Sequence, residues 1–197
     1  MSTDKEIIIA SRSGPAAFGV LYDRHATTIF RYASRRAGDA AAEDVMAETF
    51  LIAFERRHTF DPSVDHVLPW LLGIATNLLK RHHRAEARTL RAYVRSVSRH
   101  EESWSAAIDD QIDIDIATGL VAAALSSMPT IDRDTILLHT WAELSYNEIA
   151  LAMDVPVGTV RSRLNRARTT LRNILGFFPL TERDADHGRS SAATAHR

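Results

Sequence analysis

Hydrophobic residues recur at helical spacing in the first half of the chain. The first stripe, with members three or four residues apart, consists of Phe18, Leu21, Tyr22, His25 and Ile29. This spacing places side chains on one face of an amphipathic helix. The pair Gly38-Asp39 predicts the end of that helix, with Asp39 as the N-cap of the next one.

Residues 41–57 predict a second helix with two apolar faces. One face carries Val45, Thr49, Ile52 and Ala53, and the other carries Met46, Phe50 and Phe54. The remaining positions hold the acidic residues Glu43, Asp44, Glu48 and Glu55. Because a helix with two adjacent apolar faces is typical of the centre of a bundle, we assign Thr49 and Phe50 to packing.

A loop and a basic helix follow. Residues 58–69 are mostly polar and contain Asp61-Pro62 and Pro69, which predicts a loop. Helical periodicity returns with Trp70, Leu71, Ile74, Ala75 and Leu78. Since Trp70 begins this apolar stripe, we place it in the core rather than on a base-stacking surface. The alternation typical of strands occurs nowhere in the sequence, so the predicted fold class is all-α.

The second half, from about residue 116, begins with two shorter predicted helices. The first contains Leu120, Ala124 and Leu125 and stops before Pro129, because the residue that precedes a proline disfavours helix. The second runs through Leu137, Leu138 and Trp141, with Thr130 or Asp132 as its cap.

The last two predicted helices form a helix-turn-helix. The string Ser145-Tyr146-Asn147-Glu148 fits a capping box, and Asp154-Val155-Pro156 makes the turn. Gly158-Thr159 opens the last helix. Its inward positions are Val160, Leu164, Ala167 and Leu171, and its outward positions include Arg161, Ser162, Asn165 and Arg166. In DNA-binding proteins with this motif the second helix enters the major groove, so these outward side chains are candidates for DNA contacts.

The charge distribution agrees with a DNA-binding role. The net charge is −1, but residues 77–99 carry seven basic side chains against one acidic, and residues 157–175 carry five basic and no acidic ones. Residues 100–115 between them hold six acidic side chains and no Lys or Arg. Two basic segments that flank an acidic one predict two polyanion-binding surfaces joined by a linker.

Composition excludes several other classes. The 197 residues include no cysteine, which excludes disulfides and thiolate zinc sites. An apolar run long enough to span a membrane is absent from the sequence, as is a signal-peptide core. We therefore expect a cytoplasmic protein with no membrane insertion. The polar, small-residue-rich segment after about Pro179 predicts a disordered tail.

Five segments carry the strings that point to a family. They are Gly14–His25, Ala42–Leu51, Trp70-Leu71-Leu72-Gly73-Ile74-Ala75-Thr76-Asn77, Leu144–Ala150 and Val155–Leu164. In this order they resemble the extracytoplasmic-function (ECF) sigma factors of bacterial RNA polymerase, over about residues 4–176. The resemblance implies region 2 at residues 4–95, an acidic linker at 96–117, region 4 at 118–178 and a tail at 179–197.

The resemblance also implies partners and site residues. Core RNA polymerase would be bound at the clamp of its largest subunit by Glu43, Asp44 and Glu48. Promoter DNA would be contacted at the single-stranded −10 element by Asp65, His66, Val67, Leu68, Asn77, Arg81 and Arg84. The double-stranded −35 element would be contacted by Arg161, Ser162, Asn165 and Arg166. The linker would thread the active-site path of the polymerase, and the regulator would often be an anti-sigma factor.

The chain departs from the family pattern at three positions. Asp154 stands where a turn glycine is usual, and aspartate tolerates the left-handed conformation better than most residues. Lys80 replaces a frequent aspartate, and Pro69 before Trp70 is less usual. These last two bear on base preference.

Two other function classes compete with this hypothesis. An enzyme is suggested by Glu55-Arg56-Arg57-His58, half of a di-iron motif, but the sequence offers no second copy. His82 and His83 are adjacent and point about 100° apart on a helix, which does not suit one metal. We expect no catalytic residue, metal or cofactor. The other alternative is a helix-turn-helix regulator that acts without stoichiometric polymerase binding, and a weaker one is a sigma-like subunit that only sequesters a partner.

Overall fold

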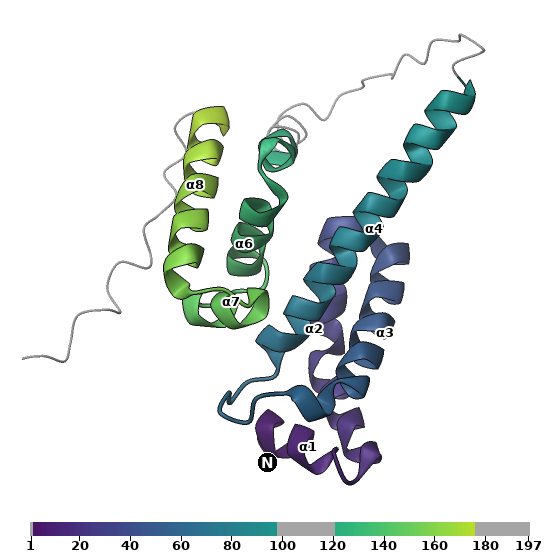
Figure 1. Ribbon diagram of the computed structural model, residues 1–197, viewed down its shortest axis with the longest axis vertical. Coiled ribbons are helices and arrows are strands. Elements are labelled where there is room, and N and C mark those ends of the chain that lie inside the picture. Colours follow the sequence, from purple (N-terminus) through teal and green to yellow (C-terminus); the bar gives the residue numbers. More distant parts are fainter. Residues whose placement is uncertain (1, 98–120, 176–197) are drawn as a thin grey trace, which may run out of the picture.

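The computed structural model describes residues 2–97 and 121–175, and every regular element within these ranges is a helix. The first range contains α1 (Asp4–Ala10), η1 (Pro15–Phe18), α2 (Gly19–Ala37), α3 (Asp39–Glu55), η2 (Arg57–Thr59) and α4 (Leu68–Val97). The second contains a helical stretch at 121–127, then α6 (Thr130–Thr140), α7 (Tyr146–Met153) and α8 (Val157–Leu175). Two helical domains result, and the all-α prediction is confirmed (Figure 1).

The break between α2 and α3 lies where the sequence predicted it. Gly38 adopts φ 78°, a left-handed value that favours glycine, and it ends α2. The predicted N-cap was wrong, because Gly38 occupies the cap position and Asp39 is already the first helical residue. The Asp39 carboxylate accepts a hydrogen bond from the Ser34 hydroxyl instead.

Helix α3 packs against both α2 and α4 in the N-terminal domain. Its buried residues are Ala42, Val45, Thr49, Phe50 and Ala53, while Met46, Ile52 and Phe54 are partly buried. Thr49 donates its hydroxyl to the Val45 carbonyl at 2.6 Å, which satisfies the polar atom inside the core. The predicted packing roles of Thr49 and Phe50 are confirmed.

Helix α4 begins at Leu68, two residues earlier than the periodicity predicted. Pro69 therefore lies in the first turn, where its missing N–H costs no helical hydrogen bond. Trp70 is partly buried and packs edge-on against Phe60, with ring centroids 5.4 Å apart. This agrees with its predicted place in the core.

The C-terminal domain begins with a helical stretch that ends before Pro129, as predicted. Helix α6 then starts at Thr130 without a side-chain cap, so neither Thr130 nor Asp132 has the predicted capping role. Asp132 is instead buried beneath α8.

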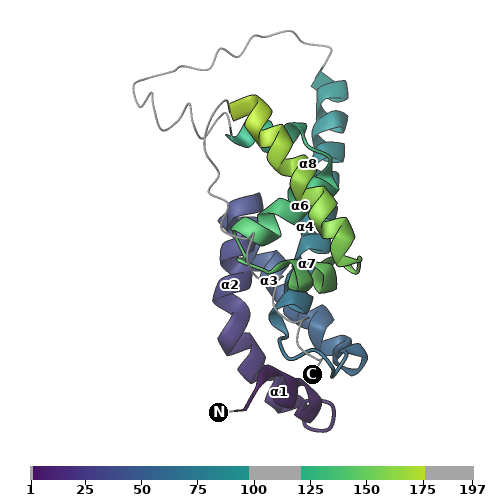
Figure 2. The ribbon, with the colours of Figure 1, turned by 90° about the vertical axis from the view of Figure 1, so that its left-hand side faces the viewer.

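The two domains lie against each other. Helix α7 packs on α4, and both views place it beside that helix (Figures 1 and 2). Apart from Ala124, the buried hydrophobic residues of the described ranges form one cluster that runs from Ile7 in α1 to Ala167 in α8. Most of the predicted acidic linker and the predicted tail fall outside the described residues.

Candidate nucleic-acid and polymerase interface

Local hydrogen bonds that the sequence predicts stabilise the helix-turn-helix. Ser145 accepts from the Glu148 backbone N–H at 3.3 Å, and Glu148 accepts from the Ser145 N–H at 2.8 Å, which completes the predicted capping box. Asp154 ends α7 at φ 51° and ψ 56°, so it takes the left-handed turn conformation as predicted. Helix α8 begins at Val157, after Asp154, Val155 and Pro156 have completed the turn.

The predicted −35 residues all lie on the outer face of α8. Val160, Leu164 and Ala167 are buried, as the spacing predicted, and the exposed residues are Arg161, Ser162, Asn165 and Arg166. The first three have no acidic partner in the described part of the chain. Helix α8 thus presents a basic and amide-bearing surface.

Arg166 has a partner that sequence reasoning missed. Its Nε and Nη2 donate to the two carboxylate oxygens of Asp132 at 2.9 and 2.8 Å. The Asp132 side chain is 4% exposed and that of Arg166 57%. The hydrogen bonds and charge of Asp132 raise the pKa of Arg166, so its charge is permanent. Asp132 therefore binds one edge of the Arg166 guanidinium. The remaining N–H groups of Arg166 lie on its other, exposed edge.

The predicted −10 residues occupy a loop and one face of α4. In the loop, Asp65 and His66 are exposed, Leu68 is half-buried, and Val67 is fully buried. Asn77, Arg81 and Arg84 are exposed at spacings of four and three residues, so they share one face of α4. Val67 therefore anchors the loop in this conformation, while the other residues remain accessible.

Two reciprocal arginines hold the base of this loop, and neither was predicted. Arg12, which follows α1, donates to the carbonyls of Arg57 and Phe60 at 3.2 and 2.7 Å. Arg57 in turn donates to the Ser11 carbonyl at 3.1 Å, and Lys5 of α1 pairs with Asp65 at 3.6 Å. An arginine whose partners are backbone carbonyls produces no periodic or motif pattern in a sequence. The sequence therefore did not indicate a role for Arg12 or Arg57.

The predicted polymerase-binding acids lie on α3. Glu43 and Asp44 are exposed, and they border a surface groove between α2 and α3 that Phe30 and Met46 also line. Glu48 differs, because it forms an ion pair with Arg81 of α4 at 3.3 Å. Both partners of that pair are substantially exposed, so it contributes little to stability.

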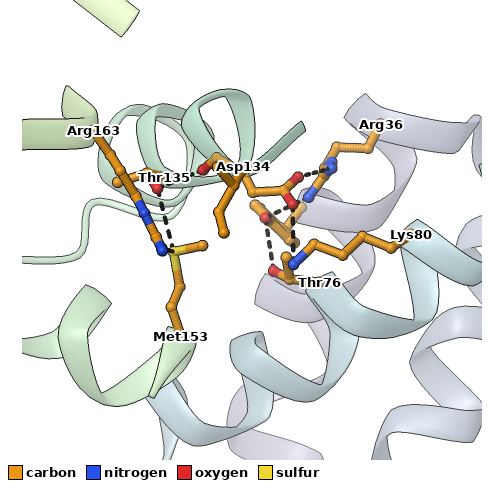
Figure 3. A network of polar contacts seen from close by, with 9 residues as sticks. Arg36, Thr76, Lys80, Asp134, Thr135, Met153 and Arg163 are labelled. Atoms are coloured by element: carbon orange, nitrogen blue, oxygen red, sulfur yellow. Dashed lines mark hydrogen bonds and ion pairs between the residues drawn. The ribbon is translucent and has the colours of Figure 1, made fainter. Parts of the chain in front are cut away.

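A buried polar cluster joins the two domains. Asp134 of α6 has no exposed side-chain surface and pairs with Arg36 of α2 and, at 3.2 Å, with Lys80 of α4 (Figure 3). Arg36 also donates to the Tyr32 hydroxyl at 2.8 Å, and Tyr32 lies 3.0 Å from the Thr76 hydroxyl. Burial raises the pKa of Tyr32, so it stays neutral. For Arg36, burial lowers the pKa, but Tyr32 and Asp134 outweigh it and raise the pKa overall.

The described residues offer neither a metal site nor a membrane-spanning helix. Among them there is no cluster of three or more His, Asp or Glu side chains able to hold a metal ion. None of their helices combines the length and apolar character needed to cross a membrane.

Two segments of the chain match known protein families. Residues 21–89 match Sigma-70 region 2, and residues 118–171 match Sigma-70, region 4, which defines an RNA polymerase initiation factor. The chain is 31% identical over 174 residues to the ECF RNA polymerase sigma factor SigL of Mycobacterium tuberculosis, across 87% of this chain and 96% of SigL. The chain belongs to the ECF sigma factor family.

Two solved structures have the same fold. One is CnrH in complex with the cytosolic domain of CnrY, with a TM-score of 0.60 and 24% identity over 88% of this chain and 97% of that chain. The other is the sigma factor RpoE in complex with the anti-sigma factor NepR from Bartonella quintana, with a TM-score of 0.52 and 21% identity over 80% and 96%. Family membership favours the sigma-factor hypothesis over the helix-turn-helix regulator.

Proposed function

We propose that this sigma factor binds core RNA polymerase through α3, reads the −35 element with α8, and reads and opens the −10 element with α4 and the loop before it. The observation that carries the proposal is the presence of two separate rows of exposed basic and amide side chains, one in each domain. A single chain with both rows is suited to contact one promoter at two places.

At the −35 element the outer face of α8 supplies the chemistry of direct readout. Arginine pairs with the O6 and N7 atoms of guanine, and asparagine pairs with adenine. Arg161, Ser162 and Asn165 are exposed on one side of the helix, so they reach a single groove together. Arg166 joins them through the edge that Asp132 leaves open.

At the −10 element the protein opens DNA without ATP, so its contacts must compensate for the lost stacking. Unstacking a base costs a few kcal/mol, which hydrogen bonds to its edge and apolar contacts offset. The exposed Asp65 and His66 and the Asn77 amide are the proposed base contacts. Arg81 and Arg84, on the same face of α4, would hold phosphates.

The polymerase contact is proposed for the exposed acids of α3. Glu43 and Asp44 are available for a basic partner such as the clamp coiled coil. Glu48 would contact the polymerase only if it gave up its ion pair with Arg81 for one with the polymerase. The remaining parts of the hypothesis are an acidic linker in the polymerase active-site path, an anti-sigma regulator, a cytoplasmic location and the absence of catalytic activity.

The proposal is tested by reconstitution with core polymerase. We expect the purified chain to co-elute with core enzyme and to direct run-off transcription from a subset of a promoter library. The double variant Glu43→Lys, Asp44→Lys should weaken core binding at least tenfold, since it reverses both exposed charges. Glu55→Lys, an exposed acid at the other end of α3, is the matched control and should bind normally. A chain that fails to bind core enzyme, or binds without choosing start sites, contradicts the proposal.

A further inference from the structure

Helix α4 extends beyond the other helices of the N-terminal domain. It is continuous from Leu68 to Val97, and Figures 1 and 2 show its second half passing the ends of α2 and α3. Leu71, Leu72 and Leu79 in its first half are fully buried, so the core of the domain fixes that end of the helix. After Gly73 the helix contains neither glycine nor proline, the residues at which helices commonly kink.

The arginines of this helix follow one line along it. Counted from Asn77, they occur at intervals of four, three, four, three and four positions, and they form an arginine stripe of Arg81, Arg84, Arg88, Arg91 and Arg95. At about 100° per residue, these positions stay within about 40° of Asn77, so they share one face of the helix. The line from Asn77 to Arg95 is ~27 Å long at ~1.5 Å per residue.

Acidic residues of the same helix do not neutralise this face. Glu86 is the only acidic residue at positions 77–97, and it falls about 180° from Asn77, on the opposite face. None of the positions three or four residues from Glu86 carries an arginine, so it is not placed to pair with the arginine stripe. On the described part of the face, Asn77, Arg81 and Arg84 are all exposed.

The chemistry of this face fits the phosphates of DNA. The arginines recur every ~5 Å along the helix axis, and each strand of a duplex carries one phosphate per ~3.4 Å of its axis. Residues 78–97 contain neither Asn nor Gln, the side chains that pair with adenine edges. Contacts to phosphate position a protein on DNA and carry no sequence information, so this face is suited to hold a duplex rather than to read it.

The direction of the arginine stripe indicates its place on a promoter. In the proposed function the loop before α4 takes the unstacked −10 bases, and the strands stay open from there toward the start site. Double-stranded DNA is therefore found on the side away from the loop. Arg88, Arg91 and Arg95 lie on that side, and the stripe from Asn77 onward covers ~8 base pairs at ~3.4 Å per base pair.

We infer that the arginine stripe binds the phosphates of the duplex spacer immediately upstream of the −10 element, without reading the spacer sequence. The face that begins with the proposed −10 contacts thus continues onto the adjoining duplex. The inference rests on the proposed function for its place at a promoter, but binding of duplex DNA by this face is a property of the chain alone.

The triple variant Arg88→Ala, Arg91→Ala, Arg95→Ala tests duplex binding in the full-length protein. Alanine is a strong helix former, and circular dichroism verifies that the helix content is kept. Fluorescence anisotropy measures the affinity for a labelled duplex of random sequence between about 50 and 200 mM salt. Each phosphate contact adds ~0.9 to the slope of log affinity against log salt, so the slope should fall by about 2.7 and the affinity about tenfold or more.

Two further triple variants are controls. Arg31→Ala, Arg35→Ala, Arg56→Ala removes the same charge from exposed positions outside the stripe, and it should keep the parental slope. Substitution of the three stripe arginines by lysine keeps the charge. It should keep both slope and affinity, because a phosphate accepts a point charge where a base edge requires the planar fork of arginine.

Holo-polymerase tests the place of the contact on a promoter taken from the run-off library. We expect the alanine variant of the stripe to bind a fragment with an intact duplex spacer about tenfold more weakly than the parent does. On a fragment whose duplex ends at the upstream edge of the −10 element, variant and parent should bind equally. Base preference at the −10 and −35 elements should not change.

The outcomes separate the inference from the proposed function. If the alanine variant keeps the parental slope on random duplex, the arginine stripe does not bind DNA and the inference is wrong. If the slope falls but the parent selects no promoter, the proposed function fails and the duplex-binding face stands. Equal weakening on both promoter fragments, loss of core binding in the alanine variant, or loss of affinity in the lysine variant would each overturn the assignment to spacer phosphates.

Discussion

Arg166 shows how a buried neighbour modifies the role of a predicted DNA-contacting residue. The Asp132 carboxylate takes two of its N–H donors, and Asp132 is itself nearly inaccessible. An arginine held along one edge loses less rotational freedom when it binds a base or phosphate with the other. Asp132 is therefore a positioning residue for Arg166 rather than a helix cap.

Substitutions of this pair should affect the −35 element selectively. We expect Arg166→Ala to reduce −35-dependent transcription about tenfold or more, because one bidentate base contact is worth about 1–3 kcal/mol. Asp132→Asn should reduce it less and should broaden −35 base preference, since the arginine remains but is no longer fixed. Run-off transcription on −35 variants measures both effects.

Core polymerase binding is the control measurement for both variants, and it should not change. Arg31→Ala, an exposed arginine on α2, is the matched substitution and should keep parental base preference. If Arg166→Ala leaves promoter-specific initiation intact, the assumed register of α8 on the DNA is wrong.

Helix α1 and the loop before α4 are coupled elements. Two isoleucines of α1, Ile7 and Ile8, are buried, so the helix docks firmly on the domain. Arg12 at its end then fixes the carbonyls of Arg57 and Phe60, where the loop begins. Val67 anchors the other end, which leaves Asp65 and His66 exposed between two fixed points.

Arg12→Ala should therefore loosen the loop without unfolding the domain. We measure the ratio of transcript yields between the best and the worst sequence in a library of −10 variants. In Arg12→Ala we expect this ratio to fall about tenfold, while binding to core polymerase is retained. Arg12→Lys should not restore discrimination, because an ammonium lacks the planar fork that reaches two carbonyls. Unaltered −10 discrimination in Arg12→Ala would show that the loop does not depend on α1.

The whole molecule is joined by its core as well as by the buried charges. The hydrophobic cluster continues from the N-terminal domain into α6, α7 and α8. Elements that share a buried interface unfold cooperatively, and elements that do not can open separately.

The free protein should accordingly unfold in one thermal transition. In Gly73→Ala we expect two transitions in differential scanning calorimetry, one for each domain, because a methyl group on Gly73 of α4 would overlap the Ala152 carbonyl oxygen of α7 and disrupt their packing. In the control Gly19→Ala the added methyl group meets nothing within 4 Å, so the single transition should be retained. Two transitions in the parent protein would indicate that the domains are not energetically coupled.

Features that depend on a few neighbouring residues were predictable from the amino-acid sequence. The helix-turn-helix and the Ser145–Glu148 capping box follow from contacts within about one helical turn, so periodicity and residue type suffice to predict them. The left-handed conformation of Asp154 was predicted from the family resemblance, which places a turn glycine at that position. Helical periodicity also predicted which faces of α4 and α8 are exposed. The caps predicted at Asp39 and at Thr130 or Asp132 were wrong, because Gly38 and Pro129 occupy the cap positions of those helices.

Contacts between distant segments required the tertiary structure. Nothing in the spacing of Asp134, Arg36 and Lys80 distinguishes them from the other charged residues, because a charge pair 98 residues apart has no period. The same holds for the Asp132–Arg166 pair and for the burial of Val67. Local patterns set which helices form and which faces carry DNA-binding groups, while the packing of one domain on the other decides which charges are buried and how far apart the two DNA-contacting surfaces lie.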